Sequence, residues 1–514
     1  MPTRLLLLAL LWLTGCASHP VPQPSHVLPA SDSPLTRRID ALAADLPYGQ
    51  SGFRLLSSSA DAFQARAEMI RAATVSLDLQ YYIVEDGLST RLLFDELMDA
   101  ADRGVRVRLL IDDTTTGDNA LRIADLAAHP NLEVRVFNPL HIGRATGVTR
   151  LLGRFLNLAQ QHQRMHNKLF LADGTLAIVG GRNLGDSYFN ADRGLNFTDI
   201  DLLVAGPAAR DLGHSFDLYW NHRLSIPLEH FQWFEPGRAE LADARARLSG
   251  ERTDRRDDDP RYRRLTRYRR APALDDWLGN LHWARGHAYW DHPDKLLAEG
   301  VPKAHLLLTT QLAPALEGVE EELTLVSAYF VPTEPGMGYF TEKAQAGVEL
   351  KILTNSLEAT DVPVVHGGYA PYRIPLLELG AELYELRRQP EEDVAFSVTG
   401  SSESALHSKA AIFDRERVFL GSLNFDPRSI LWNSEVGVLV DSPWLAGKVH
   451  ELTEQGMHPA VSYQVKLSGP PDDRQLVWVA EDGGKLRVLT EEPGSRWRKF
   501  NAWLARFIGL ERML

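Results

Sequence analysis

The chain has 514 residues, of which 44% are hydrophobic and 24% charged, so it has room for two globular domains plus terminal segments. Its formal net charge of −13 argues against a general nucleic-acid binder, because such proteins present a basic surface. The only cysteine, Cys16, excludes an intrachain disulfide.

The N-terminus predicts an exported protein. Arg4 precedes an apolar run over residues 5–13, which is too short for a convincing transmembrane span. The next residues, Thr14-Gly15-Cys16, complete a segment that resembles the bacterial lipobox, in which the cysteine is lipidated. We therefore expect residues 1–16 to be a lipoprotein signal peptide with lipidation at Cys16. An ordinary signal peptide with an unrelated cysteine is the alternative.

Residues 17–45 are expected to form a tether, since the stretch after Cys16 is rich in Pro and Ser and has no periodicity. Ala17 and Ser18 lack the Asp that, in many bacteria, retains lipoproteins at the inner membrane. That resemblance implies anchoring in the cell envelope, with the outer membrane and its periplasmic face favoured.

Two stretches further along repeat one pattern. Residues 74–82 resemble residues 322–330 as strands, and a helical pattern follows each. Residues 103–112 then resemble residues 346–354, and Gly104 and Gly347 fall where a helix C-cap belongs. Strand, helix and strand with short connections predict βαβ units and a parallel-biased sheet.

A short motif, H-x-K-x4-D-x6-G-[GS]-x-N, also occurs twice, with its histidines 241 residues apart. The glycines of the βαβ pattern are 243 apart, so a whole domain is duplicated. The two copies comprise His166, Lys168, Asp173, Gly180, Gly181 and Asn183, and His407, Lys409, Asp414, Gly421, Ser422 and Asn424.

Each motif predicts a hairpin, because an apolar run lies on both sides of the Asp. Strand alternation places the His and the Lys on one face, and the small residues near the Asn let the backbone approach a ligand. Two lysines and two asparagines can hold an anion with several oxygens, while two imidazoles supply a nucleophile and a general acid. This chemistry fits phosphodiester transfer and needs no metal or cofactor.

Further acids occur at matching places. Asp199 and Glu435 each precede a later apolar run, and we expect them to accept the imidazole N–H and so orient the histidines. Asp173 and Asp414 lie at the hairpin turns, where a structural role is favoured over a catalytic one.

The paired motifs resemble the HKD motifs of the phospholipase D superfamily. The segments 164–168, 180–183, 424–429 and 433–435 are similar to those of bacterial cardiolipin synthases of type C. The resemblance implies two duplicated phospholipase D-like α/β domains that form a pseudo-dimer with one shared active site. It further implies that His166, Lys168, Asn183, His407, Lys409 and Asn424 are catalytic.

The resemblance also implies a phosphatidyl transferase that makes cardiolipin from two phospholipids through a phosphatidyl-histidine. His166 is the nucleophile by the superfamily's habit, and the reverse assignment to His407 is the alternative. The donor would be phosphatidylglycerol or phosphatidylethanolamine. A phospholipase D that forms phosphatidic acid is the first alternative, followed by a nuclease-type phosphodiesterase and a non-catalytic scaffold. Expected partners are phospholipids and a membrane surface, with no nucleic acid, while the need for an accessory protein stays open.

The predicted domain boundaries are 46–227 for the first domain, 228–300 for an inter-domain insertion and 301–463 for the second domain. Residues 464–514 are expected to form a hairpin and an amphipathic helix. That helix, with its aromatic and basic residues, is interpreted as a membrane-surface helix, or else as one docked on the protein. Residues 148–158 allow the same two interpretations.

Five polar or aromatic residues upstream of the motifs are weaker candidates for the pocket. A packing role is favoured for any one of them. They are Tyr82, Asp112, His366, Tyr372 and Arg373.

Overall fold

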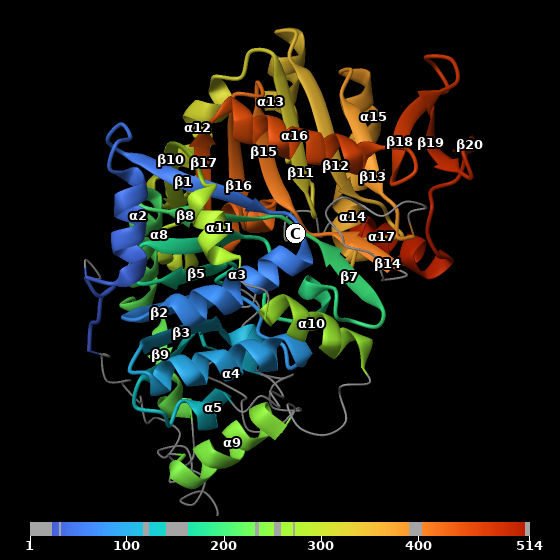
Figure 1. Ribbon diagram of the computed structural model, residues 1–514. Coiled ribbons are helices and arrows are strands. Elements are labelled where there is room, and N and C mark those ends of the chain that lie inside the picture. Colours follow the sequence, from blue (N-terminus) through green and yellow to red (C-terminus); the bar gives the residue numbers. More distant parts are fainter. Residues whose placement is uncertain are drawn as a thin grey trace, which may run out of the picture.

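The computed structural model describes residues 23–29, 32–116, 123–139, 163–231, 236–250, 259–270, 273–389 and 403–508. The expected signal peptide, its Cys16 and the segment 148–158 lie outside these ranges. Within them the protein is a mixed α/β structure whose two halves are drawn in blue to green and in yellow to red in Figure 1.

Eight strands form the first half of the sheet. Strand pairing gives the spatial order β9-β4-β3-β2-β5-β6-β8-β1, with β2, β3 and β4 parallel to one another. The strands are β1 (Gln50–Leu56), β2 (Ser76–Tyr81), β3 (Arg106–Asp112), β4 (Leu132–Phe137), β5 (Leu169–Ala172), β6 (Leu176–Gly180), β8 (Asp201–Ala205) and β9 (Ser225–Pro227).

The second half repeats this order as β10-β17-β16-β15-β11-β12-β13-β18, and the hairpin β19–β20 extends it. These strands are β10 (His282–Trp290), β11 (Glu322–Ser327), β12 (Glu349–Asn355), β13 (Glu382–Leu386), β15 (Lys409–Phe413), β16 (Arg417–Gly421), β17 (Val436–Asp441), β18 (Ser462–Ser468), β19 (Gln475–Asp482) and β20 (Lys485–Leu489). A separate two-stranded sheet pairs β7 (Leu195–Thr198) with β14 (Glu403–Leu406).

Strands β1 and β10 pair with each other and join the halves into one sheet. Each of the two lies at the end of its own half-sheet, β1 beside β8 and β10 beside β17. Strand β10 therefore has the place in the second half that β1 has in the first. The structure therefore draws the domain boundary differently from the sequence. Residues 282–290, expected within an insertion, form a strand of the second half's sheet.

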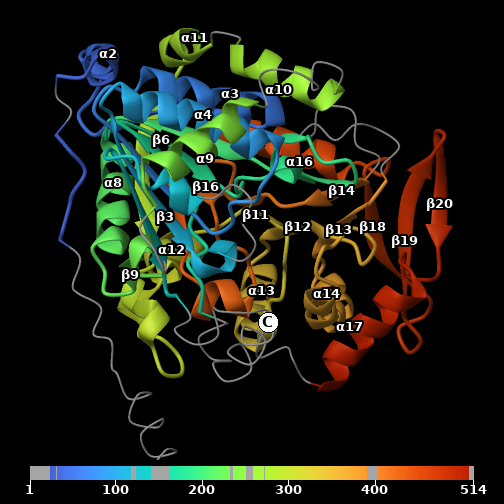
Figure 2. The same ribbon diagram turned by 90° about the horizontal axis from the view of Figure 1, so that it is seen from below.

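Helices lie on both sides of each half, as Figures 1 and 2 show. The helices are α2 (Pro34–Ala43), α3 (Ser59–Ala72), α4 (Leu88–Asp102), α5 (Ile123–Leu126), α8 (Pro207–Trp220), α9 (Arg238–Gly250), α10 (Pro260–Arg270), α11 (Leu274–Gly279), α12 (Leu308–Glu317), α13 (Thr333–Gln345), α14 (Pro363–Tyr369), α15 (Arg373–Glu378), α16 (Pro443–Met457) and α17 (Arg496–Ile508).

The largest apolar contact between the halves is a shared core. Val179 and Val204 of the first half belong to the same buried cluster as Leu420 and Val438 of the second. Helices α8 and α16 add leucine, valine and phenylalanine side chains to this cluster. Because burial of apolar area is the main favourable term in folding, this core fixes how the halves sit together and hence how the two motifs meet.

The duplicated βαβ pattern and both hairpins are as predicted. Gly104 and Gly347 end α4 and α13 with positive φ values of 92°. In the hairpins, Asp173 and Asp414 have φ values of 49° and 53°, a region that Asp tolerates better than most residues. One detail differs. Leu77 pairs with Ala172 and Leu323 pairs with Phe413, the equivalent hairpin positions, so Tyr81 corresponds to Ser327 and not to Tyr329.

Part of the expected tether is structured. Residues 34–43 form α2, capped by the Ser33 side chain. Upstream, the amides of Ser25 and Val27 donate to Asn221 and Asp217, at and just beyond the end of α8. The described part of this segment therefore packs on the first half, because its backbone polar groups find partners there.

Candidate active site

The segment that carries His407 is held by a strand from the other half. Strands β7 and β14 run parallel with Thr198 opposite Leu406, so the residues that follow them are neighbours. The His407 amide donates to the Thr198 carbonyl at 2.8 Å. Asp199 consequently reaches the His407 ring, with 2.7 Å between Oδ2 and Nδ1.

The segment that carries His166 is held in the same reciprocal way. The amides of His166 and Ser434 donate to the carbonyls of Ser434 and Arg164, each at 2.9 Å. Glu435 follows Ser434 and places its two carboxylate oxygens 3.0 and 2.9 Å from the His166 Nδ1. Each histidine therefore contacts a carboxylate supplied by the opposite half.

This arrangement determines the tautomer. An ionised carboxylate can only accept, so the Nδ1 that faces it carries the proton and Nε2 keeps its lone pair. Burial and the nearby lysine charges lower the pKa of His166 and of His407, which favours neutral rings. Burial also raises the pKa of Glu435 to about 7 and that of Asp199 to about 6.

The two motif lysines lie beside the histidines and are buried. Lys168 Nζ donates to the His166 carbonyl at 2.6 Å, and Lys409 donates to the His407 carbonyl. Burial lowers the pKa of both ammonium groups. A charged lysine in this position is poorly solvated, so an anion that enters the site would relieve an existing cost.

The motif asparagines have different surroundings. The Asn183 amide donates to the Tyr188 hydroxyl at 2.8 Å, while its oxygen accepts from the Ile83 amide. The Asn424 side-chain oxygen is buried and lacks a hydrogen-bond partner among the described residues. Both side chains are buried.

The small residues of the motif make room for the carboxylates. A Cβ added at Gly181 would lie 2.5 Å from both Asp199 carboxylate oxygens. The equivalent Ser422 donates its hydroxyl to Glu435 at 2.5 Å and accepts from the Val436 amide. In the G-[GS] part of the motif, Gly181 therefore leaves room for the acid beside its histidine, whereas Ser422 donates a hydrogen bond to the acid.

The motif aspartates Asp173 and Asp414 do not enter the site. The Asp173 carboxylate accepts from the amides of residues 74–76, where β2 begins. Asp414 accepts from the amides of residues 320–322, where β11 begins. Both tie a hairpin turn to the neighbouring strand.

Aromatic residues surround the histidines, and one of them, Tyr82, is among the weaker pocket candidates named from the sequence. The Tyr82 ring lies edge-on to His166 with 5.0 Å between centroids, and Lys168 lies over the same ring. Tyr188 and Phe197 flank His407 at 5.3 and 5.1 Å. Tyr188 lies only five residues after Asn183, and this closeness to the motif is the signal by which the sequence could have identified it.

Glu435 is also supported from the segment expected as an insertion. The buried pair Asp291–Lys295 has an O–N distance of 2.9 Å, and Asp291 accepts from the Glu435 amide at 2.9 Å. Lys295 donates in addition to the Ser429 carbonyl. No motif marks these residues, so sequence analysis could not find them.

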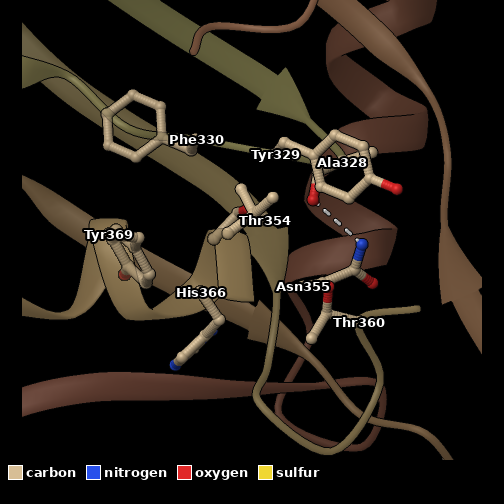
Figure 3. Close-up of a pocket in the computed structure, with 9 residues that line it drawn as sticks. Ala328, Tyr329, Phe330, Thr354, Asn355, Thr360, His366 and Tyr369 are labelled. Atoms are coloured by element: carbon tan, nitrogen blue, oxygen red, sulfur yellow. Dashed lines mark hydrogen bonds between the residues drawn. The ribbon is translucent and has the colours of Figure 1, made fainter. Parts of the chain in front are cut away.

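Three other weaker pocket candidates, Asp112, His366 and Arg373, lie in different places. The Asp112 carboxylate accepts from the Met165 amide and faces Arg164, so it supports the segment before His166. His366 lines a small cavity with Asn355 and Tyr369, shown in Figure 3. Arg373 is buried against Glu385 and Glu492.

Two kinds of feature are absent from the described residues. No cluster of three or more metal-binding side chains occurs in those ranges. Among the helices in the same ranges, none has the length and apolar character to span a bilayer.

Comparison with known proteins places this geometry in a family. The family model described as "Cardiolipin synthase, PLD-like domain" matches residues 67–216 and 312–456, once for each half. Cardiolipin synthase C of Escherichia coli is 38% identical over 477 residues, 91% of this chain and 97% of that protein. An uncharacterized protein of Helicobacter pylori is 32% identical and aligns over 87% of this chain and 88% of its own length.

A solved structure gives an independent view of the fold. The phosphatidylserine synthase of Haemophilus influenzae superposes with a TM-score of 0.57 at 14% sequence identity, covering 93% of this chain and 99% of that one. The duplicated family match and the closely related full-length sequences lead to one conclusion. The chain belongs to the phospholipase D superfamily and, within it, to the cardiolipin synthase family.

Proposed function

We propose that the protein joins two phospholipids by phosphatidyl transfer and that its product is cardiolipin. The observation that carries the proposal is the pair of buried histidines, each oriented by a carboxylate from the opposite half. The similarity to cardiolipin synthase C, over nearly the whole of both proteins, supports this choice of substrates.

In the first step, the Nε2 lone pair of His166 attacks the phosphorus of the donor lipid. An N–P bond forms while the bond to the head-group oxygen breaks, and His407 gives that oxygen a proton. Lys168, Lys409, Asn183 and Asn424 hold the phosphoryl oxygens in this scheme. The anionic phosphate favours the protonated form of the His407 ring, which burial otherwise disfavours.

In the second step, a hydroxyl of the second phospholipid gives its proton to His407 and attacks the phosphatidyl-histidine. The O–P bond forms, the N–P bond breaks, and His166 returns to its starting state. With phosphatidylglycerol as acceptor the product is cardiolipin, and the released alcohol is the donor's head group.

Burial of the site favours a lipid hydroxyl over water as acceptor. His166, Lys168, His407 and Lys409 are all buried, so bulk water has little access to the N–P bond. The same chemistry with water would make phosphatidic acid, which is the product of the competing phospholipase.

The test is lipid mass spectrometry of a bacterium that lacks cardiolipin and expresses this chain. Cardiolipin should appear with the intact protein, disappear with His166→Ala and with His407→Ala, and remain with His214→Ala, a control at an exposed histidine on α8. Phosphatidic acid without cardiolipin would replace the transferase with the hydrolase. An unchanged lipid profile would contradict both.

The covalent step has its own readout. Purified protein is mixed with phosphatidylglycerol and denatured at alkaline pH, where phosphoramidates survive. Peptide mass spectrometry should find the phosphatidyl group on the peptide that contains His166. An adduct on His407 instead would reverse the two roles, and direct transfer without any adduct would remove the intermediate.

A further inference from the structure

The C-terminal helix α17 has two faces of different character. Ala502 is buried against α14, where its carbonyl comes so close to Gly367 that a Cβ there would lie 2.4 Å away. Figures 1 and 2 both show α17 lying along α14 at the outside of the second half. Within residues 496–504, the helix therefore packs on the protein through the face that carries Ala502.

The opposite face exposes three aromatic rings. Trp497, Phe500 and Trp503 follow a spacing of three residues and are 69%, 46% and 55% exposed. Their rings contact one another in series, with centroid distances of 5.8 and 6.0 Å. Large aromatic side chains grouped in this way on a surface mark a contact with another molecule.

Basic side chains border the three rings. Arg496 is exposed at the start of the helix, and Lys499 precedes Trp503 by four residues, about one helical turn, with Glu491 at 3.6 Å. This local positive charge stands out in a chain whose net charge is −13. Aromatic rings at the head-group level with Lys and Arg beside them are the composition of a helix that lies in a membrane interface.

The docked face of α17 is connected to the active site by hydrogen bonds through one loop. Arg498 Nη1 donates to the carbonyls of Leu357 and Thr360, in the loop that follows β12. At the start of this loop, the Asn355 side chain bonds both the amide and the carbonyl of Leu406, the residue before His407. One short loop thus joins the helix to a catalytic segment.

The chain entering α17 is fixed to the same region. Glu492 accepts from His366 at 2.7 Å and from Arg373 at 2.6 Å, on α14 and α15. These helices follow the carboxyl end of β12, the edge of the sheet where Lys409 pairs with Ser327 of β11. Helix α17 therefore lies at the active-site edge of the second half.

We propose that Trp497, Phe500 and Trp503, with Arg496 and Lys499, dock α17 on an anionic phospholipid bilayer and hold the active-site edge at the lipid surface. The choice of a bilayer as occupant rests on charge complementarity and on the size of the surface. A single helical face is small compared with the roughly 1,000 Å² that a stable protein interface buries. The choice of lipid also rests on the proposed function, because that function draws its substrates from a membrane.

The test reads the surface itself and needs no turnover. In the full-length chain carrying Cys16→Ser and His166→Ala, a single cysteine at position 503 (Trp503→Cys) is labelled with an environment-sensitive fluorophore. Labelled Trp444→Cys is the matched control, because Trp444 on α16 is 53% exposed. Vesicles of phosphatidylglycerol and phosphatidylethanolamine are the probe, and phosphatidylcholine vesicles test the charge dependence.

The label at position 503 should shift to the blue with anionic vesicles and become accessible to quenchers carried on lipid acyl chains. The label at position 444 should respond to neither. Replacing Trp497 and Phe500 by Ala in the labelled chain should weaken the apparent affinity for anionic vesicles on the order of tenfold or more, since interfacial binding scales with buried apolar area. Higher salt should weaken it further.

Two outcomes would overturn the inference. Equal responses at positions 503 and 444 would mean that α17 does not face the lipid. A response at 503 that follows protein concentration without vesicles would identify a second copy of the chain as the occupant. Because His166→Ala is present throughout, insertion is scored whether or not cardiolipin is made, so this test and that of the proposed function fail separately.

Discussion

Replacing Glu435 with Gln separates catalysis from stability at this site. The side chain keeps its shape and its place against His166 and Ser422, but it loses its charge. If the new NH2 group faces the ring, Nδ1 must accept and the proton moves to Nε2. The lone pair required for attack is then absent, which is the wrong-tautomer defect known from catalytic triads.

Glu435→Gln is expected to lower kcat and to raise the stability of the folded protein. By analogy with the triad aspartate, kcat should fall by about 10³ to 10⁴, or about 4 to 5.5 kcal/mol of barrier, with KM nearly unchanged. Stability should rise at neutral pH, because burial raises the pKa of Glu435 from 4.5 to about 7. A shift of this size corresponds to a cost of about 3 kcal/mol for the ionised group in the folded state.

The pH dependence follows from the same shift. Between pH 4.5 and about 7 the folded protein binds a proton that the unfolded chain has released, so this group's contribution to stability falls as pH rises through that window. Glu435→Gln removes that slope, and its advantage over the natural chain should vanish below the window. Urea unfolding at several pH values measures the stability, and cardiolipin formation in mixed micelles measures kcat.

Glu451→Gln, on the exposed side of α16, is the control and should change neither quantity. The reasoning is refuted if Glu435→Gln retains kcat within about tenfold of the natural chain, since orientation of His166 would then be dispensable. It is equally refuted if the variant is less stable at pH 7 and above, because the buried charge would then not be costly.

Three further substitutions test neighbouring features. Gly181→Ala should displace Asp199 and lower kcat at least about a hundredfold while the fold persists, whereas Gly338→Ala, whose Cβ meets nothing within 4 Å, should leave kcat unchanged in the same assay. Asp173→Ala should cost roughly 2 to 3 kcal/mol in urea unfolding, because three backbone amides lose their acceptor, with little change in kcat per folded molecule. Lys295→Met should cost about 3 to 5 kcal/mol at neutral pH in the same unfolding assay, since it leaves Asp291 buried without its partner.

Local structure was largely predictable because it depends on neighbours in the sequence. The turn at Asp173, the helix end at Gly104 and the C-terminal hairpin around Gly483 all arise from residues whose backbone preferences are strong. The fold class, two phospholipase D-like α/β halves, is confirmed by the structure and by the family match. The aspartates expected in structural roles are found holding strands rather than facing the histidines.

Contacts between distant segments could not be predicted. Nothing near Asp199 or Glu435 in the sequence says which histidine each one reaches, because that depends on the packing of the two halves. The role of β10 was hidden for a similar reason, since its polar and aromatic residues resemble an insertion more than a buried strand. For α17, the periodicity revealed an amphipathic helix but not which of its faces the protein covers.

The reciprocal acids have a consequence for how such a chain can evolve. A substitution at Glu435 is felt by the histidine of the other copy, so selection on either half constrains both and neither can drift alone. The copies have nevertheless diverged at this point, with Asp on one side and the longer Glu on the other. The nearest carboxylate oxygen nonetheless lies 2.9 Å from Nδ1 on one side and 2.7 Å on the other, so two acids of different length make the same contact across the halves.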